Sequence, residues 1–232
     1  MPLIANPATL YGIGEPELVL ADGFKMRPGT ARAYLAMKEA AAADGIAMAV
    51  TSSYRDFERQ LAIWNGKAEG KRPILDANGQ PLDAKSLSDN ALIDAILLWS
   101  ALPGCSRHHL GTDIDVYAPD NISRDALKLE LPEYEPHGPC HGLSCWLDAN
   151  ANRFGFFRPY QAGKSGVSPE PWHLSFAPEA EPLMAGFDLS ALATHLERAP
   201  LALKSAVLLR LDELVERYVR FYAAPPVTEP SV

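Results

Sequence analysis

The sequence predicts an α+β fold built from short strands and separate helices. Apolar and polar residues alternate at 46–51, as in a half-buried strand, and the alternation at 113–117 predicts a second strand. Apolar residues at helical spacing occur in separate segments. These segments do not alternate regularly with the predicted strands, which argues against a doubly wound parallel sheet.

The first predicted elements follow an N-terminal segment without clear periodicity. Residues 1–29 contain several prolines, so we predict an irregular lead-in. Thr30 is expected to cap a helix that runs to about Ala43, with Gly45 just beyond its end. A short strand over 46–51 follows.

Two further helices are predicted on either side of a polar segment. Asp56 is expected to cap a helix that ends at Gly66. Residues 67–90 are polar and rich in Pro and Gly, with a turn at Asn78-Gly79, and their length is typical of a functional loop or lid. Ser88 or Asp89 then begins a helix that Pro103-Gly104 stops.

The middle of the chain alternates strands with long connections. A strand is predicted at 113–117, a long connection at 118–141 and a helix at about 143–153. Strands are expected from Gly155-Phe156-Phe157 and over 172–176.

The last part of the chain has helical patterns of its own. Helices are predicted at about 189–198 and 201–222, and residues 225–232 are predicted to be disordered. One stripe of the second helix is apolar; it consists of Val207, Leu211, Leu214, Tyr218 and Phe221. We expect this stripe to pack on the preceding domain, the alternative being an association surface.

Composition excludes several classes of protein. The 232 residues include 21 Lys and Arg against 29 Asp and Glu, a net charge of −8, which argues against a nucleic-acid partner. No apolar run approaches the roughly 20 residues of a membrane span. The first residues lack the basic and apolar regions of a secretory signal, so we expect a cytoplasmic protein, a periplasmic or released one being the alternative. Three cysteines cannot form a dense disulfide framework.

Three residues could form a catalytic zinc site. Such a site uses three nitrogen or oxygen ligands and leaves one position open for water. His108, Asp115 and His173 could supply two imidazoles and one carboxylate, and Gly111 permits a tight turn between the first two.

A base and an anion-binding group accompany these ligands. Glu170 lies three residues before His173, where it could take a proton from water and deliver it to a leaving amine. Arg55 could hold a substrate carboxylate or a developing oxyanion. Each short pattern is weak alone, because His108-His109 could be a polar loop and Glu170 a solvated acid; the joint pattern is stronger.

The combination resembles the zinc D-alanyl-D-alanine carboxypeptidases of the VanY type. That group also contains VanX-like D,D-dipeptidases, phage peptidoglycan endopeptidases and the hedgehog domain. Four blocks occur in the family's order over roughly residues 30–178: Tyr54-Arg55 with Gln60; Ser106, His108, Gly111 and Asp115; Trp146-Leu147, Asn150-Ala151 and Phe154-Gly155-Phe156; and Glu170-Pro171-Trp172-His173.

The resemblance implies a hedgehog/D,D-peptidase-like fold, with a small antiparallel sheet flanked by helices. It implies a zinc peptidase domain at 30–184, with a C-terminal helical extension at 185–224 outside the family pattern. It also implies that Zn²⁺ is bound by His108, Asp115 and His173, that Glu170 is the catalytic base and that Arg55 holds the substrate or the oxyanion. The residues implied to line the substrate site are Ser106, Gln60, Tyr54 and Trp172.

Two residues near the implied ligands depart from the family or vary within it. Asp113 stands where the family often has Ala; it could orient a ligand histidine or turn to solvent, and we favour the first. His109 occupies a variable position, and we do not expect it to bind the metal.

A second group of possible metal ligands lies in the long connection. His137, Cys140, His141 and Cys145 could form a structural zinc site, or the two cysteines a disulfide. The spacing is atypical, so we favour ordinary loop and helix residues. Cys105 is expected to be a small buried residue and not a nucleophile.

The leading hypothesis is a zinc carboxypeptidase that releases a terminal D-amino acid, D-Ala, from peptidoglycan stem peptides. The alternatives are a peptidoglycan endopeptidase of the same group and a non-catalytic, zinc-containing binding module. The sequence leaves open D,D- against L,D-cleavage, the exact stem peptide and the oligomeric state.

Overall fold

The structure is a computed structural model that describes residues 6–226. The helices are α1 (Pro28–Ala43), α2 (Phe57–Ala68), α3 (Asp89–Leu97), α4 (Leu131–Tyr134), α5 (His141–Asn150), α6 (Ala177–Met184), α7 (Leu189–Arg198), α8 (Lys204–Leu209) and α9 (Leu211–Val215). The strands are β1 (Val19–Ala21), β2 (Phe24–Met26), β3 (Ala49–Ser52), β4 (Ile74–Leu75), β5 (Pro81–Leu82), β6 (Asp113–Tyr117), β7 (Phe156–Phe157) and β8 (His173–Phe176). The predicted α+β class is confirmed.

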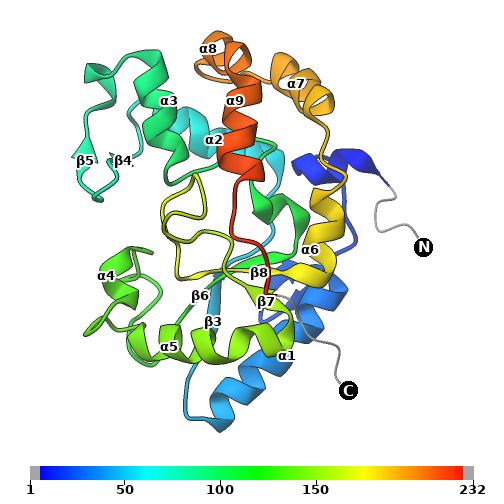
Figure 1. The fold of residues 1–232 in the computed structure, drawn as a ribbon, viewed down its shortest axis with the longest axis vertical. Coiled ribbons are helices and arrows are strands. Elements are labelled where there is room, and N and C mark those ends of the chain that lie inside the picture. Colours follow the sequence, from blue (N-terminus) through cyan, green and yellow to red (C-terminus); the bar gives the residue numbers. More distant parts are fainter. Residues whose placement is uncertain (1–5, 227–232) are drawn as a thin grey trace.

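A four-stranded antiparallel sheet lies in the middle of the molecule, with strand order β3-β6-β8-β7 (Figure 1). Every residue of β6 is buried, and this central strand is paired with β3 on one edge and β8 on the other. The register places Asp115 opposite His173 on one side and opposite Ser52 on the other. The sheet therefore brings together residues from three distant parts of the sequence.

The buried hydrophobic side chains form two separate cores. One joins the sheet to α1 and α5, which run along the lower side of the molecule in Figure 1. The other joins α2 and α3 to the helices beyond residue 185. The apolar stripe of the C-terminal segment packs in this second core, as predicted, except for Phe221, which is exposed.

The N-terminal lead-in is more ordered than predicted. Residues 7–11 form a 3-10 helix, and β1 and β2 form a hairpin. Asp22 and Gly23, at the turn of this hairpin, both have positive φ, as in the Asp-Gly turns that join antiparallel strands. The prediction of an irregular segment was wrong because this dipeptide signal was overlooked.

The N-terminus of α1 is capped from a distance. The helix begins at Pro28, and Thr30 is not its cap. The Glu179 carboxylate accepts hydrogen bonds from the backbone N–H groups of Gly29 and Thr30 and from the Thr30 hydroxyl. A cap 149 residues away cannot be inferred from local sequence. By contrast, the predicted Asp56 cap of α2 is confirmed by its hydrogen bond to the Arg59 N–H.

Several predicted boundaries also differ. Helix α2 continues past Gly66 to Ala68, and α3 ends at Leu97, before the proline expected to stop it. The segment 67–90 contains the β4–β5 hairpin, closed by the predicted turn at Asn78-Gly79. Helices α4 and α6 were not predicted.

The predicted helix over 201–222 is divided into α8, α9 and a π-helical turn at Glu216–Arg220. The break falls at Arg210, whose guanidinium group binds Asp94 of α3 and Glu213. The predicted disordered tail falls mostly on residues 227–232, outside the described residues. Within residues 6–226, none of the helices has the length and apolar character of a membrane span.

Candidate metal centre

The three predicted metal ligands converge in the structure. His108 lies in a 3-10 helix (Arg107–Leu110), Asp115 lies on β6, and His173 begins β8. One potential ligand atom from each lies within 4.8 Å of the others. His108 Nε2 is 3.2 Å from Asp115 Oδ2, and His173 Nδ1 is 3.1 Å from Asp115 Oδ1.

Gly111 allows the His108 segment to fold back onto β6. Gly111 follows the 3-10 helix with a φ of +72°, in the left-handed region that residues other than glycine rarely adopt. A Cβ added here would lie 2.7 Å from Leu18 Cδ2. The backbone is also fixed by a hydrogen bond from the Arg27 N–H to the Gly111 carbonyl.

We predict that Gly111→Ala destabilises the protein more than Gly45→Ala. Gly45 has a similar φ of +77° but no atom within 4 Å of an added Cβ, so it reports backbone strain alone, roughly 1–2 kcal/mol. Gly111→Ala adds the overlap with Leu18, which should cost roughly 1 kcal/mol more. Urea denaturation of both variants measures the difference. Equal losses would show that the Leu18 contact relaxes freely.

The donor set and its surroundings fit a zinc ion. Two imidazoles and one carboxylate are a frequent catalytic zinc set, leaving one position for water. His108 Nδ1 is buried without a hydrogen-bond partner, and Asp115 Oδ1 is buried and forms no hydrogen bond of good geometry although His173 Nδ1 lies 3.1 Å away. Burial disfavours ionisation of Asp115, but His108 and His173 outweigh this effect and hold its pKa well below its usual range. A buried carboxylate that stays charged between two imidazoles suits a cation.

Asp113 fixes the orientation of His173. Asp113 Oδ1 lies 3.0 Å from His173 Nε2, which leaves Nδ1 facing the other ligands. Arg107 Nε donates to the same oxygen at 2.9 Å, and the Thr112 hydroxyl donates to Oδ2. Asp113 is fully buried, so the structure matches the interpretation in which it orients a ligand histidine and not the one in which it turns to solvent.

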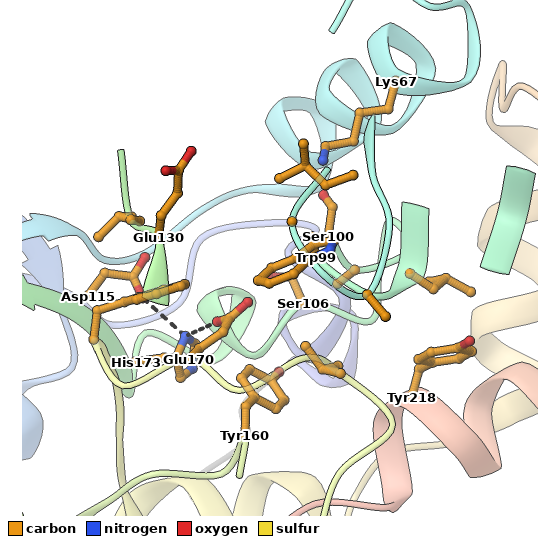
Figure 2. A pocket seen from close by; sticks show the side chains of 18 of the residues that line it. Lys67, Trp99, Ser100, Ser106, Asp115, Glu130, Tyr160, Glu170, His173 and Tyr218 are labelled. Carbon is orange, nitrogen blue, oxygen red and sulfur yellow. Dashed lines mark ion pairs between the residues drawn. The ribbon is translucent and has the colours of Figure 1, made fainter. Parts of the chain in front are cut away.

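Glu170 lies at the edge of this cluster, where it can act as a base. Its Oε2 is 3.5 Å from His173 Nδ1, and Figure 2 shows the ion pairs of Asp115 and Glu170 meeting at His173. Burial raises the pKa of Glu170 to about 7, and the nearby His173 charge partly opposes this shift. A carboxylate with this pKa can both accept and return a proton near neutral pH.

His109 is a structural residue in this site. Its Nδ1 lies 2.6 Å from the Arg55 carbonyl, and its Nε2 accepts from the Gly104 N–H. Burial lowers the pKa of His109 to about 4, so the ring is neutral and joins these two segments. It is not among the converging ligands, as expected.

Arg55 faces the site and is held from behind. Its Nη1 donates to Gln60 Oε1 at 2.8 Å, and its Nη2 donates to Ser52 Oγ. Gln60 is completely buried and also donates to the Ala101 carbonyl. Gln60 therefore positions Arg55 from behind and does not lie on the cavity wall.

A cavity of about 760 Å³ extends from the metal ligands. Ser106 and Trp172 line it, whereas Tyr54 does not. Further lining residues, not named as candidates from the sequence, include Lys67 in the predicted loop 67–90, Trp99, Ser100 and Tyr160; the Tyr160 ring packs 4.8 Å from the His173 ring. No local spacing marks these residues, because the fold alone brings their segments to the site.

The C-terminal helices form part of the same cavity. The residues that they contribute are Leu214, Val215, Tyr218 and Val219. Tyr218 lies opposite the metal ligands in Figure 2. The apolar stripe of this segment thus borders the site as well as the core.

The cysteines have ordinary roles. All three are free, and Cys140 is buried with its sulfur near the Ala118 N–H. Cys145 is exposed, 3.6 Å from His141 Nε2, and joins no metal-binding group among the described residues. Burial raises the pKa of the Cys105 thiol, as expected for a residue that is not a nucleophile.

Comparison with known sequences identifies related proteins. A D-alanyl-D-alanine carboxypeptidase of Enterococcus faecalis is 34% identical over 142 residues, which cover 60% of this chain and 43% of the relative. An uncharacterized protein of Haemophilus influenzae is 45% identical over 71 residues, 31% of this chain and 49% of the relative. The chain thus spans about half the length of these curated relatives.

Solved structures share the fold. A variant of the vancomycin resistance D,D-pentapeptidase VanY, in complex with Zn(II), superposes with a TM-score of 0.52 at 27% identity, over 83% of this chain and 90% of that one. VanYB in complex with D-alanine-D-alanine gives a TM-score of 0.53, also at 27% identity, over 78% and 90% of the two chains.

The family is shown by a sequence profile. The profile of VanY, D-alanyl-D-alanine carboxypeptidase, matches residues 23–179, which is more than half of the chain. These residues contain His108, Asp115, Glu170 and His173. The chain therefore belongs to the VanY D-alanyl-D-alanine carboxypeptidase family.

Proposed function

We propose that this protein is a zinc-dependent carboxypeptidase that releases a terminal D-Ala from peptidoglycan stem peptides. The observation that carries the proposal is the buried His108–Asp115–His173 cluster with Glu170 beside it, at the end of a cavity. Support also comes from the Enterococcus relative, which is a D-alanyl-D-alanine carboxypeptidase, and from VanYB, which binds D-alanine-D-alanine.

The residues divide the chemistry among them. When bound by His108, Asp115 and His173, zinc would acidify a water molecule and polarise the scissile carbonyl. Glu170 takes the proton of the attacking water and returns it to the leaving amine. Arg55, oriented by Gln60 and Ser52, stabilises negative charge that develops on the carbonyl oxygen.

Digestion of defined stem peptides tests this function. Purified protein with Zn²⁺ is incubated with a pentapeptide ending in D-Ala-D-Ala and with a tetrapeptide ending in a single D-Ala, and the products are resolved by mass spectrometry. We expect loss of one D-Ala from at least one peptide. The peptide that is cleaved distinguishes D,D- from L,D-activity.

Two other results would contradict the proposal. A cut inside the stem would indicate an endopeptidase. Tight zinc binding without hydrolysis of either peptide, over a range of pH and metal concentration, would indicate a non-catalytic binding module.

A further inference from the structure

We propose that Lys67 binds the free carboxylate at the C-terminus of the substrate and thereby restricts cleavage to the last residue. This inference rests on the proposed function and deepens it, because it assigns the exopeptidase character to one side chain. Lys67 lies in the last turn of α2 and lines the cavity with Arg55 and Ser100.

The first observation is that the Lys67 ammonium group has no partner in the part of the chain that the structure describes. Among residues 6–226, no carboxylate oxygen lies within 4.0 Å of its Nζ, and Nζ donates no hydrogen bond. Lys71, four positions later, is exposed and pairs with Glu69 at 2.6 Å. Lys67 instead carries its charge into the cavity, where Figure 2 shows it above Trp99 and beside Ser100.

The second observation is that the surroundings disfavour this charge. Lys67 is half-buried, and burial lowers its pKa, with the Arg72 charge adding to the effect and Glu170 opposing it. An anion in the cavity would offset both the lost hydration and the repulsion. A charge kept in such a place without a counter-ion suits an anionic ligand.

The position of Lys67 suits a terminal carboxylate. In a C-terminal residue the carboxylate lies about one residue length, ~3.8 Å, beyond the scissile carbonyl. Lys67 and Arg55 line the same cavity, and the Lys67 charge acts to lower the pKa of Glu170. The Lys67 Nζ nevertheless lies more than 4.0 Å from the Glu170 carboxylate oxygens. It can therefore meet the end of the substrate while Arg55 remains at the carbonyl.

This arrangement would exclude internal peptide bonds. A substrate that continues past the scissile bond has a neutral amide where the carboxylate would lie. The Lys67 ammonium group would then be desolvated without a counter-charge, which costs binding free energy. Lys67 would therefore favour substrates that end immediately after the cleaved bond.

The test compares the stem peptide that the protein cleaves, ending in D-Ala-D-Ala or in a single D-Ala, with the same peptide carrying a C-terminal carboxamide. Lys67→Met retains the stem of the side chain but removes the charge, and Lys67→Arg restores a cation. Lys71→Met is the matched control, since it removes a lysine charge nearby that faces solvent. Steady-state kinetics give kcat and KM for each peptide with the zinc-loaded proteins.

We expect Lys67→Met to raise KM for the acid peptide by roughly 30-fold or more and to change kcat much less. The preference for acid over carboxamide should fall to within about threefold, and Lys67→Arg should recover part of it. Lys71→Met should retain the wild-type preference. An equal loss on both peptides, or an unchanged preference, would overturn the proposal.

A binding measurement separates this inference from the proposed function. Calorimetry with zinc-loaded Glu170→Gln protein gives the affinity for both peptides without hydrolysis. If wild-type protein cleaves neither the pentapeptide nor the tetrapeptide, the proposed function fails. The role of Lys67 then stands only if the acid binds more tightly and Lys67→Met, added to Glu170→Gln, abolishes the difference.

Discussion

Glu170→Gln is expected to lower kcat on the cleaved stem peptide by roughly 10²- to 10⁴-fold while zinc stays bound, because the glutamine cannot accept a proton from water. The amide has nearly the shape of the carboxylate, so the cavity is preserved. The three ligand side chains are unchanged, and the Glu170 carboxylate approaches His173 Nδ1 only to 3.5 Å. Product analysis by mass spectrometry gives the rate, and metal analysis of the dialysed protein gives the zinc content.

A surface glutamate provides the control for this change. Glu69 directly follows α2 and pairs with exposed Lys71, so Glu69→Gln should retain wild-type activity and zinc. Loss of zinc from Glu170→Gln would mean that Glu170 helps to bind the metal. Near wild-type turnover would mean that another group takes the proton, and the mechanism would be wrong.

The candidate metal ligands could be predicted from sequence because each lies in a compact pattern. Gly111 shapes the turn after His108, and only Pro171 and Trp172 separate Glu170 from His173. What the sequence could not provide is the register that sets Asp115 opposite His173. That pairing joins residues 58 positions apart, and it depends on the sheet as a whole.

The residues around the ligands were harder to predict, since tertiary contacts decide their roles. Gln60 was predicted at the substrate site, yet its side chain is buried behind Arg55. Lys67 and Tyr160 reach the cavity only because α2 and the segment before β8 pack there. The Glu179 cap of α1 depends on the same kind of long-range contact.

The fold agrees best with local patterns where one short segment carries the whole signal. Strand β6 and the start of α2 agree with their predictions. The predicted helix over 201–222 failed, since its apolar period continues through a break that Arg210 stabilises with ion pairs to Asp94 and Glu213. A break of this kind cannot be predicted from the spacing of apolar residues, because the core side chains before and after it remain buried.

Asp113→Asn is expected to weaken zinc binding by about 10- to 100-fold, because Asp113 holds the ligand His173 in place. The carboxylate accepts hydrogen bonds from His173 Nε2, Arg107 Nε and the Thr112 hydroxyl. An asparagine has one acceptor oxygen and a donor amino group, so it cannot satisfy all three donors. Competition with a chromophoric chelator measures the affinity for Zn²⁺.

The same substitution should also destabilise the metal-free protein. The Arg107 side chain is 3% exposed, and burial opposes its charge, but Asp113 outweighs burial and keeps its pKa raised. Without the Asp113 charge, Arg107 keeps a hydrogen bond to the Ser175 hydroxyl, and among the described residues Glu181, at 3.6 Å, is the one carboxylate left within 4.0 Å of its guanidinium group. Breaking a buried ion pair on one side costs roughly 3–5 kcal/mol, which urea denaturation in the presence of EDTA would detect.

Asp94→Asn is the matched control, because Asp94 pairs with Arg210 at 2.8 Å near the surface, with 40% of its side chain exposed. Exposed pairs contribute roughly 0.2–1 kcal/mol, so this variant should lose little stability and bind zinc normally.

If Asp113→Asn lost stability but kept full zinc affinity, Asp113 would serve only as the counter-charge of Arg107. If it lost zinc affinity without losing stability, its action would be confined to the orientation of His173. Loss of both is the result that the shared oxygen predicts, since His173 and Arg107 bind the same Oδ1 of Asp113.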